Sequence, residues 1–118
     1  MTTASLVLAV SLAVFYLLLG VSKVSATSPM RERAAHVGIS VGTYRGIGAL
    51  EVAGAVGLLI GGLVPAVGAA ACVGLLLLMV GAVVTHVRNG DGLREMAPAI
   101  LVSALILAYL VVLFGSIR

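Results

Sequence analysis

The amino-acid sequence predicts an all-α integral membrane protein with four transmembrane helices. Composition is the first reason: 62% of the 118 residues are hydrophobic and 9% are charged, far outside the range of soluble domains. The second reason is that residues 4–22, 52–85 and 96–117 contain no charged side chain. Because about 20 helical residues cross the hydrocarbon layer, each of these runs is long enough to span a bilayer. No segment alternates apolar and polar residues as the strands of a membrane barrel do.

The four spans are expected at about residues 4–24, 44–63, 66–87 and 97–116. We expect the first span to be retained, because the residues before it carry no basic side chain and its apolar run exceeds a signal-peptide core. The second uncharged run is too long for one crossing, and Gly61-Gly62-Leu63-Val64-Pro65 divides it. Thr43 is the expected cap of the second span and Asp91 that of the fourth. The sequence shows no internal repeat and no low-complexity linker, so residues 1–118 are expected to form one domain.

A short helix is expected between the first two spans, over about residues 29–36. Ser28 and Pro29 are typical of a helix start, with Ser as the cap and Pro at the first helical position. Met30 and Ala34 share one face of this helix, and Arg33 lies on another. Such an amphipathic segment is expected to lie flat in the membrane interface.

The basic residues predict the orientation of the chain. They are concentrated in the first and third loops and at their edges: Lys23, Arg31, Arg33, Arg45, Arg88 and Arg94. Since Lys and Arg favour the cytoplasmic side, loops one and three are expected in the cytoplasm and both termini outside. Topology and anionic lipid account for these charges, so no nucleic-acid partner is expected.

Small residues on the second and third spans predict close helix packing. Gly57 and Gly61 form one small-xxx-small pair, and Ala70 and Gly74 form another. Surfaces of this kind let helix backbones approach closely. They suit the interior of a four-helix bundle, a homodimer seam or the surface of a larger membrane partner, and the sequence leaves these alternatives open.

Glu51 is the residue that points most strongly to chemistry. It lies about seven residues after Tyr44, which places it roughly 10 Å below the expected start of the second span. Ionisable groups at such depth usually face the bundle interior, find a partner and serve a function. Antiparallel spans bring Lys23 and His86 to the same membrane face. Lys23 is the natural counter-charge for Glu51, or its long side chain could extend to the interface instead. His86 could donate to Glu51 or stay neutral and act as a base. We expect an acid/base pocket in which Glu51, Lys23, His86 and Asp91 are catalytic.

Three further residues are expected to contact a ligand of that pocket. Tyr16 lies on the same stripe of the first span as Gly20 and Lys23, and so places a phenol deeper on that face. Arg45 and Arg88 lie closer to water at the same end of the bundle.

The sequence lacks the residue patterns of zinc sites, internal disulfides and phosphate-binding loops. Cys72, His36 and His86 lie in different segments and make no closed zinc set. A single cysteine excludes an internal disulfide. No glycine-rich phosphate loop of the Walker type occurs. The sequence therefore calls for no cofactor and no metal.

Several motifs resemble those of the DoxX-like membrane proteins, over roughly residues 18–101. They are LGVSK at 19–23, RGIGALEVAG at 45–54, GLLLLMVGA at 74–82 and THVRNGD at 85–91. The resemblance implies a four-helix bundle, and the residues that carry over are Lys23, Glu51, His86, Arg88 and Asp91. It implies no single activity, because relatives include a subunit of thiosulfate–quinone oxidoreductase, accessory partners of redox proteins and a chaperone of receptor assembly. Cysteine-based redox roles do not transfer to a chain whose one cysteine is Cys72.

Two functions are consistent with these observations. In the first, a lipophilic small molecule enters the pocket from the bilayer and undergoes acid/base chemistry there, such as isomerisation, cyclisation or epoxide opening. In the second, the chain is a non-catalytic accessory subunit or assembly factor of a membrane oxidoreductase complex. The sequence alone does not decide whether the protein is an enzyme.

Overall fold

In the computed structural model, residues 2–116 are described, and they form five helices and no strand. The helices are α1 (Thr3–Val24), α2 (Ser28–His36), α3 (Val41–Ile60), α4 (Pro65–Arg88) and α5 (Leu93–Ser116). All except α2 are long and apolar enough to cross a membrane. The predicted all-α membrane fold is confirmed, and α2 occupies the place of the predicted short helix.

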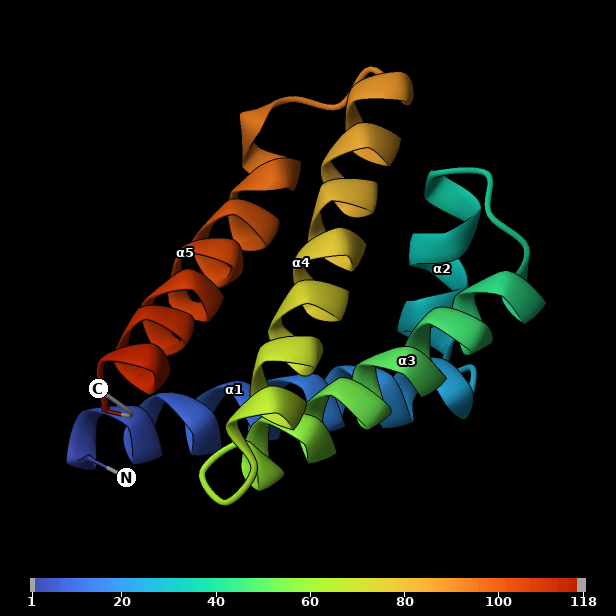
Figure 1. The fold of residues 1–118 in the computed structure, drawn as a ribbon. Coiled ribbons are helices and arrows are strands. Elements are labelled where there is room, and N and C mark those ends of the chain that lie inside the picture. Colours follow the sequence, from blue (N-terminus) through green and yellow to red (C-terminus); the bar gives the residue numbers. More distant parts are fainter. Residues whose placement is uncertain (1, 117–118) are drawn as a thin grey trace.

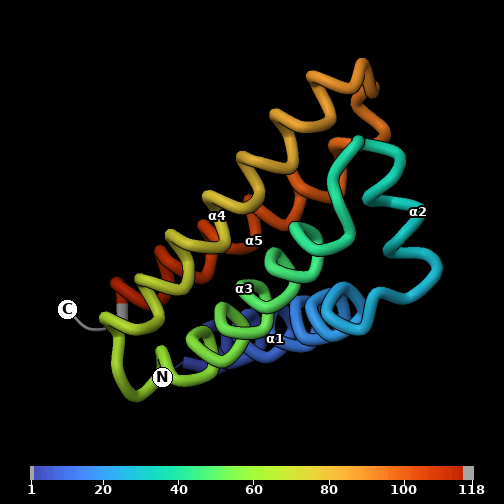
Figure 2. Tube along the Cα trace, turned by 90° about the vertical axis from the view of Figure 1, so that its right-hand side faces the viewer, coloured from blue at the N-terminus to red at the C-terminus, as the bar shows by residue number. Residues whose placement is uncertain are grey.

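The four long helices form two antiparallel pairs that cross one another. Helix α1 packs along α3, and α4 packs along α5, while α3–α4 and α1–α5 contacts join the pairs. Figure 1 shows the α4–α5 pair rising steeply from the α1–α3 pair, with the two pairs closest near the turn that joins α3 to α4. They diverge toward the end that carries α2 and the α4–α5 loop, as Figure 2 also shows. That end holds most of the charged residues.

Side-chain hydrogen bonds cap α1 and α3 but not α2 or α4, and three predicted caps are wrong. Ser28, the predicted cap of the short helix, is its first helical residue, because Thr27 takes the cap position without a side-chain hydrogen bond. Thr43 does not cap α3: its backbone N–H donates to Ser40 Oγ at 3.1 Å, so the helix begins at Val41, earlier than expected. Asp91 does not cap α5 either. Glu95 accepts from the Gly92 N–H at 2.9 Å instead. A cap must reach an unpaired N–H of the first turn, and Asp91 is engaged elsewhere.

The α1–α3 contact is close because glycines face each other. A β-carbon built on Gly20 would lie 2.7 Å from the carbonyl oxygen of Gly48. One built on Gly48 would lie 2.6 Å from Lys23 Cβ. Neither distance leaves room for a side chain, so the two backbones touch directly.

The α3–α4 contact uses one of the two predicted small-residue pairs. Gly57 packs against Ala71, and Gly61 packs against Gly68 and the hydroxyl of Tyr109. The same hydroxyl donates to the carbonyl oxygen of Leu58 at 3.1 Å, which ties α5 to the end of α3. Internal packing is thus confirmed for Gly57 and Gly61.

The other small-residue pair lies on the outside of the bundle. Ala70 and Gly74 are both exposed, and a β-carbon built on Gly74 would meet nothing within 4 Å. Packing within the chain therefore makes no use of this pair.

We predict that Gly48→Ala destabilises the bundle by about 1–3 kcal/mol, the usual effect of forcing a methyl group into a packed contact. Gly46→Ala is the matched control on the same helix, because Gly46 is exposed and its added methyl would meet nothing within 4 Å. The control should be neutral or slightly stabilising, since Ala is the better helix former. Free energies of unfolding in a detergent titration measure both. Equal effects of the two substitutions would contradict the close α1–α3 contact.

Candidate functional site

A cleft of about 820 Å³ lies between the two helix pairs, and all five helices contribute residues to it. This volume is in the range of pockets that hold small organic ligands. Its apolar wall is formed by Phe15, Leu19, Leu77, Leu78, Met79 and Val102, among others. The polar and charged lining residues include Lys23, Glu32, Arg33, His36, Tyr44, Glu51, His86 and Glu95. The cleft is therefore apolar with a polar end.

The ion pair expected from the sequence is present between α1 and α3. Lys23 Nζ donates to Glu51 Oε1, and Glu51 is only 1% exposed. The Lys23 side chain is 11% exposed, which makes it the more accessible partner. Its ammonium also lies 4.8 Å from the centroid of the Tyr44 ring, within range of a cation–π interaction. Lys23 is thus held from two sides.

Two buried polar atoms near this pair have no hydrogen-bond partner within the described chain. They are Glu51 Oε2 and the hydroxyl of Tyr16. Tyr16 is fully buried in the hydrophobic core and makes an edge-to-face contact with Phe15, with ring centroids 5.2 Å apart. It is not a lining residue of the cleft. Tyr16 therefore lies behind the cleft, where the sequence had suggested a direct ligand contact.

His86 pairs with Asp91 and not with Glu51. The sequence suggested that it could donate to Glu51, but its Nδ1 lies 2.6 Å from Asp91 Oδ2, and it makes no hydrogen bond with Glu51. Because a carboxylate only accepts, Nδ1 is the donor. The ring lines the cleft, and its Nε2 has no hydrogen-bond partner among residues 2–116. His86 and Asp91 thus form a carboxylate–imidazole dyad at the end of α4.

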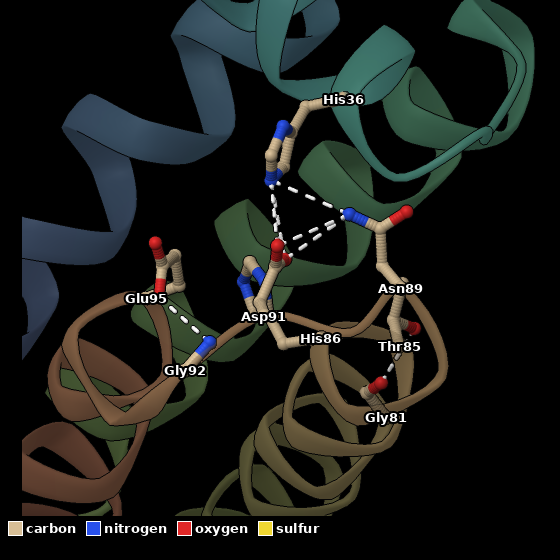
Figure 3. A network of polar contacts seen from close by, with 8 residues as sticks. All are labelled: His36, Gly81, Thr85, His86, Asn89, Asp91, Gly92 and Glu95. Atoms are coloured by element: carbon tan, nitrogen blue, oxygen red, sulfur yellow. Dashed lines mark hydrogen bonds and ion pairs between the residues drawn. The ribbon is translucent and has the colours of Figure 1, made fainter.

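Asp91 also connects the α4–α5 loop to α2, through a residue that sequence reasoning did not select for the site. His36 Nε2 lies 3.0 Å from Asp91 Oδ1, and Asn89 Nδ2 donates to the same carboxylate at 3.2 Å. Figure 3 shows the two imidazoles and the Asn89 amide around Asp91. The only sequence feature that points to His36 is its position at the end of the predicted interfacial helix. Nothing in the sequence indicates its pairing with a loop so far along the chain.

These hydrogen bonds affect the acidity of Asp91. The hydrogen bond from His86 holds the pKa of its carboxyl below the ordinary value, and those from Asn89 and His36 act in the same direction. Asp91 is therefore a carboxylate at neutral pH.

Arg45 and Arg88, the other expected ligand contacts, are exposed and do not line the cleft. Asp91 is likewise absent from the lining, which it reaches only through the histidines. Lys23, Glu51 and His86 are the predicted site residues that the structure brings to the cleft.

The sequence was compared with models of known protein families. Residues 7–112 match the model of the DoxX-like family. The protein belongs to the DoxX-like family. No curated protein and no solved structure matches this chain.

Within residues 2–116 of this DoxX-like protein, no three His, Cys, Asp or Glu side chains are arranged to hold a metal ion. Cys72 is a free, buried cysteine in the hydrophobic core. The ionisable groups that line the cleft are an ammonium, carboxylates, imidazoles, the Arg33 guanidinium and the Tyr44 phenol.

We predict that Asp91→Asn lowers thermal stability at neutral pH and that this difference shrinks on acidification. The folded-state pKa of Asp91 is below the unfolded value of about 4, so its contribution is complete above that pH. It is lost as pH falls through the lowered folded value. Melting temperatures of both proteins in detergent, from neutral pH to about pH 3, measure the difference. Glu32→Gln is the control at an exposed carboxyl, and an Asp91→Asn difference constant over this range would contradict the assignment.

Proposed function

We propose that this DoxX-like protein binds a lipophilic small molecule in its interhelical cleft and catalyses acid/base chemistry on it, such as isomerisation, cyclisation or epoxide opening. The observation that carries the proposal is the position of the Lys23–Glu51 pair, buried between membrane-spanning helices yet lining a cleft of about 820 Å³. Apolar walls suit the body of a lipophile, and the ion pair suits its functional group.

Burial of the Lys23–Glu51 pair supports a functional role more than a role in fixing the register of α1 against α3. Taking two charges out of water costs several kcal/mol each, and apolar residues of similar size often stabilise a protein as well or better. Two glycines already hold α1 and α3 together beside the pair. Ionisable groups inside a membrane protein are retained mostly where they act on a substrate, ion or proton.

The proposed roles follow from accessibility and hydrogen bonding. Lys23 is the more exposed member of its pair and would meet the ligand as hydrogen-bond or proton donor, while Glu51 holds and balances its charge. His86 lines the cleft from α4, with Nδ1 engaged by Asp91. Its other ring nitrogen would act as the base, as in other carboxylate–imidazole dyads. An acid and a base would thus act from different walls of one cleft.

We also propose that the end of the bundle carrying α2 faces the cytoplasm. Arg31, Arg33, Arg45 and Arg88 are exposed at this end, and Lys and Arg favour the cytoplasmic side. A reporter active only in the cytoplasm, inserted after Gly90, should be active, and one fused to the C-terminus should be silent. The reverse pattern would contradict this orientation.

The ligand hypothesis is tested by purification in mild detergent, followed by solvent extraction and mass spectrometry of bound lipophiles. Lys23→Met and Glu51→Gln should each reduce the retained ligand at least roughly tenfold, which corresponds to about 1.4 kcal/mol of lost contact. Arg94→Met is the matched control, a loss of charge at an exposed residue outside the cleft lining, and should retain the ligand.

Removal of one partner of a buried pair also destabilises a protein, typically by 3–5 kcal/mol. The double variant Lys23→Met/Glu51→Leu therefore separates the two roles, because it removes the charges together and should restore stability without restoring ligand. A double variant that regains both stability and ligand would show a purely structural pair. It would favour a non-catalytic accessory role instead.

A further inference from the structure

Most charged groups of the cleft have a partner within the protein, and the exception is Glu51 Oε2, which is buried and accepts no hydrogen bond from the described residues. Lys23 is paired with Glu51, and the Glu95 carboxylate accepts from a backbone N–H of the α4–α5 loop. The two histidines of the lining both bind Asp91. The remaining charged lining residues, Glu32 and Arg33, are exposed, adjacent and opposite in sign. Lys23 and Glu51 therefore balance each other at the buried end of the cleft, whereas Glu32, Arg33 and Glu95, which together carry one net negative charge, are exposed.

Lys23 nevertheless has hydrogen-bonding capacity left. An ammonium has three N–H donors. Glu51 Oε1 accepts from one, and the Tyr44 ring interacts with the charge without a conventional acceptor atom. No other residue among those described accepts from Lys23 Nζ. The ammonium can thus still donate to a ligand in the cleft.

Charge decides which ligand group suits this donor. An anionic group would compete with Glu51 for Lys23 and would bring a second negative charge close to a carboxylate that is 1% exposed. A cationic group would meet the Lys23 ammonium. Both would also lose their hydration on entering an apolar cleft. An uncharged oxygen acceptor satisfies the ammonium and leaves the ion pair intact.

We infer that the ligand of this cleft is an uncharged lipophile that directs a carbonyl or ether oxygen at Lys23 Nζ. The inference rests on the proposed function and specifies the class of molecule bound. The Glu51 carboxylate disfavours fatty-acid anions at this position, and the Lys23 ammonium disfavours quaternary ammonium lipids.

Four probes with the same dodecyl chain test the inference: a methyl ketone, a methyl ether, a carboxylate and a trimethylammonium salt. Dodecane serves as the reference without a polar group. The protein is placed in nanodiscs of phosphatidylcholine, and the binding of each radiolabelled probe is measured relative to empty nanodiscs. This reference removes differences in simple partitioning into lipid.

The ketone and the ether should bind at least roughly tenfold more tightly than either ionic probe. In the Lys23→Met/Glu51→Leu variant, ketone affinity should fall to that of dodecane, while Arg94→Met, at an exposed residue outside the lining, should leave it unchanged. Tighter binding of the carboxylate or the ammonium salt would overturn the uncharged-ligand inference and leave a binding cleft in place. Binding of none of the probes, dodecane included, would overturn the proposed function itself.

Discussion

The close approach of α1 and α3 is the constraint on which the candidate site depends. Gly20 and Gly48 remove the side chains that would separate these helices, and Lys23 Cβ lies in the space above Gly48. The lysine is thereby brought beside Glu51, one turn further along α3. A larger residue at Gly48 would move both the backbone and the ammonium. The same contact therefore organises the helix pair and positions its buried charges.

The two ends of the bundle are held by different kinds of interaction. At the α3–α4 turn, small residues pack closely and Tyr109 donates to a carbonyl oxygen of α3. At the opposite end the pairs diverge, and α2 has no backbone contact with α4 or α5. The Asp91 cluster bridges that gap through partly exposed polar side chains. Such contacts exchange readily with water, so this end is the less stable one.

Divergence of the helix pairs gives a small protein room for a ligand. If all four spans packed side by side along their whole length, they would bury their apolar faces against one another and leave no cleft. Here the α1–α3 pair supplies Lys23 and Glu51, and the α4–α5 side supplies His86 and most of the apolar wall. Membership of the DoxX-like family agrees with the bundle but does not determine the chemistry, because function resides in the site rather than in the fold.

The sequence by itself determined the number of spans, their approximate limits and the placement of Glu51 and Lys23 toward the same membrane face. These follow from constraints that act along one helix: the thickness of the bilayer, the rise per residue and the cost of an unpaired charge in lipid. Only the tertiary structure decided that His86 binds Asp91, that His36 joins them, and that Tyr16 lies behind the cleft. Those outcomes depend on the angle between two helix pairs and on which face each helix turns inward. Apolar spans with small residues on several faces do not specify either one.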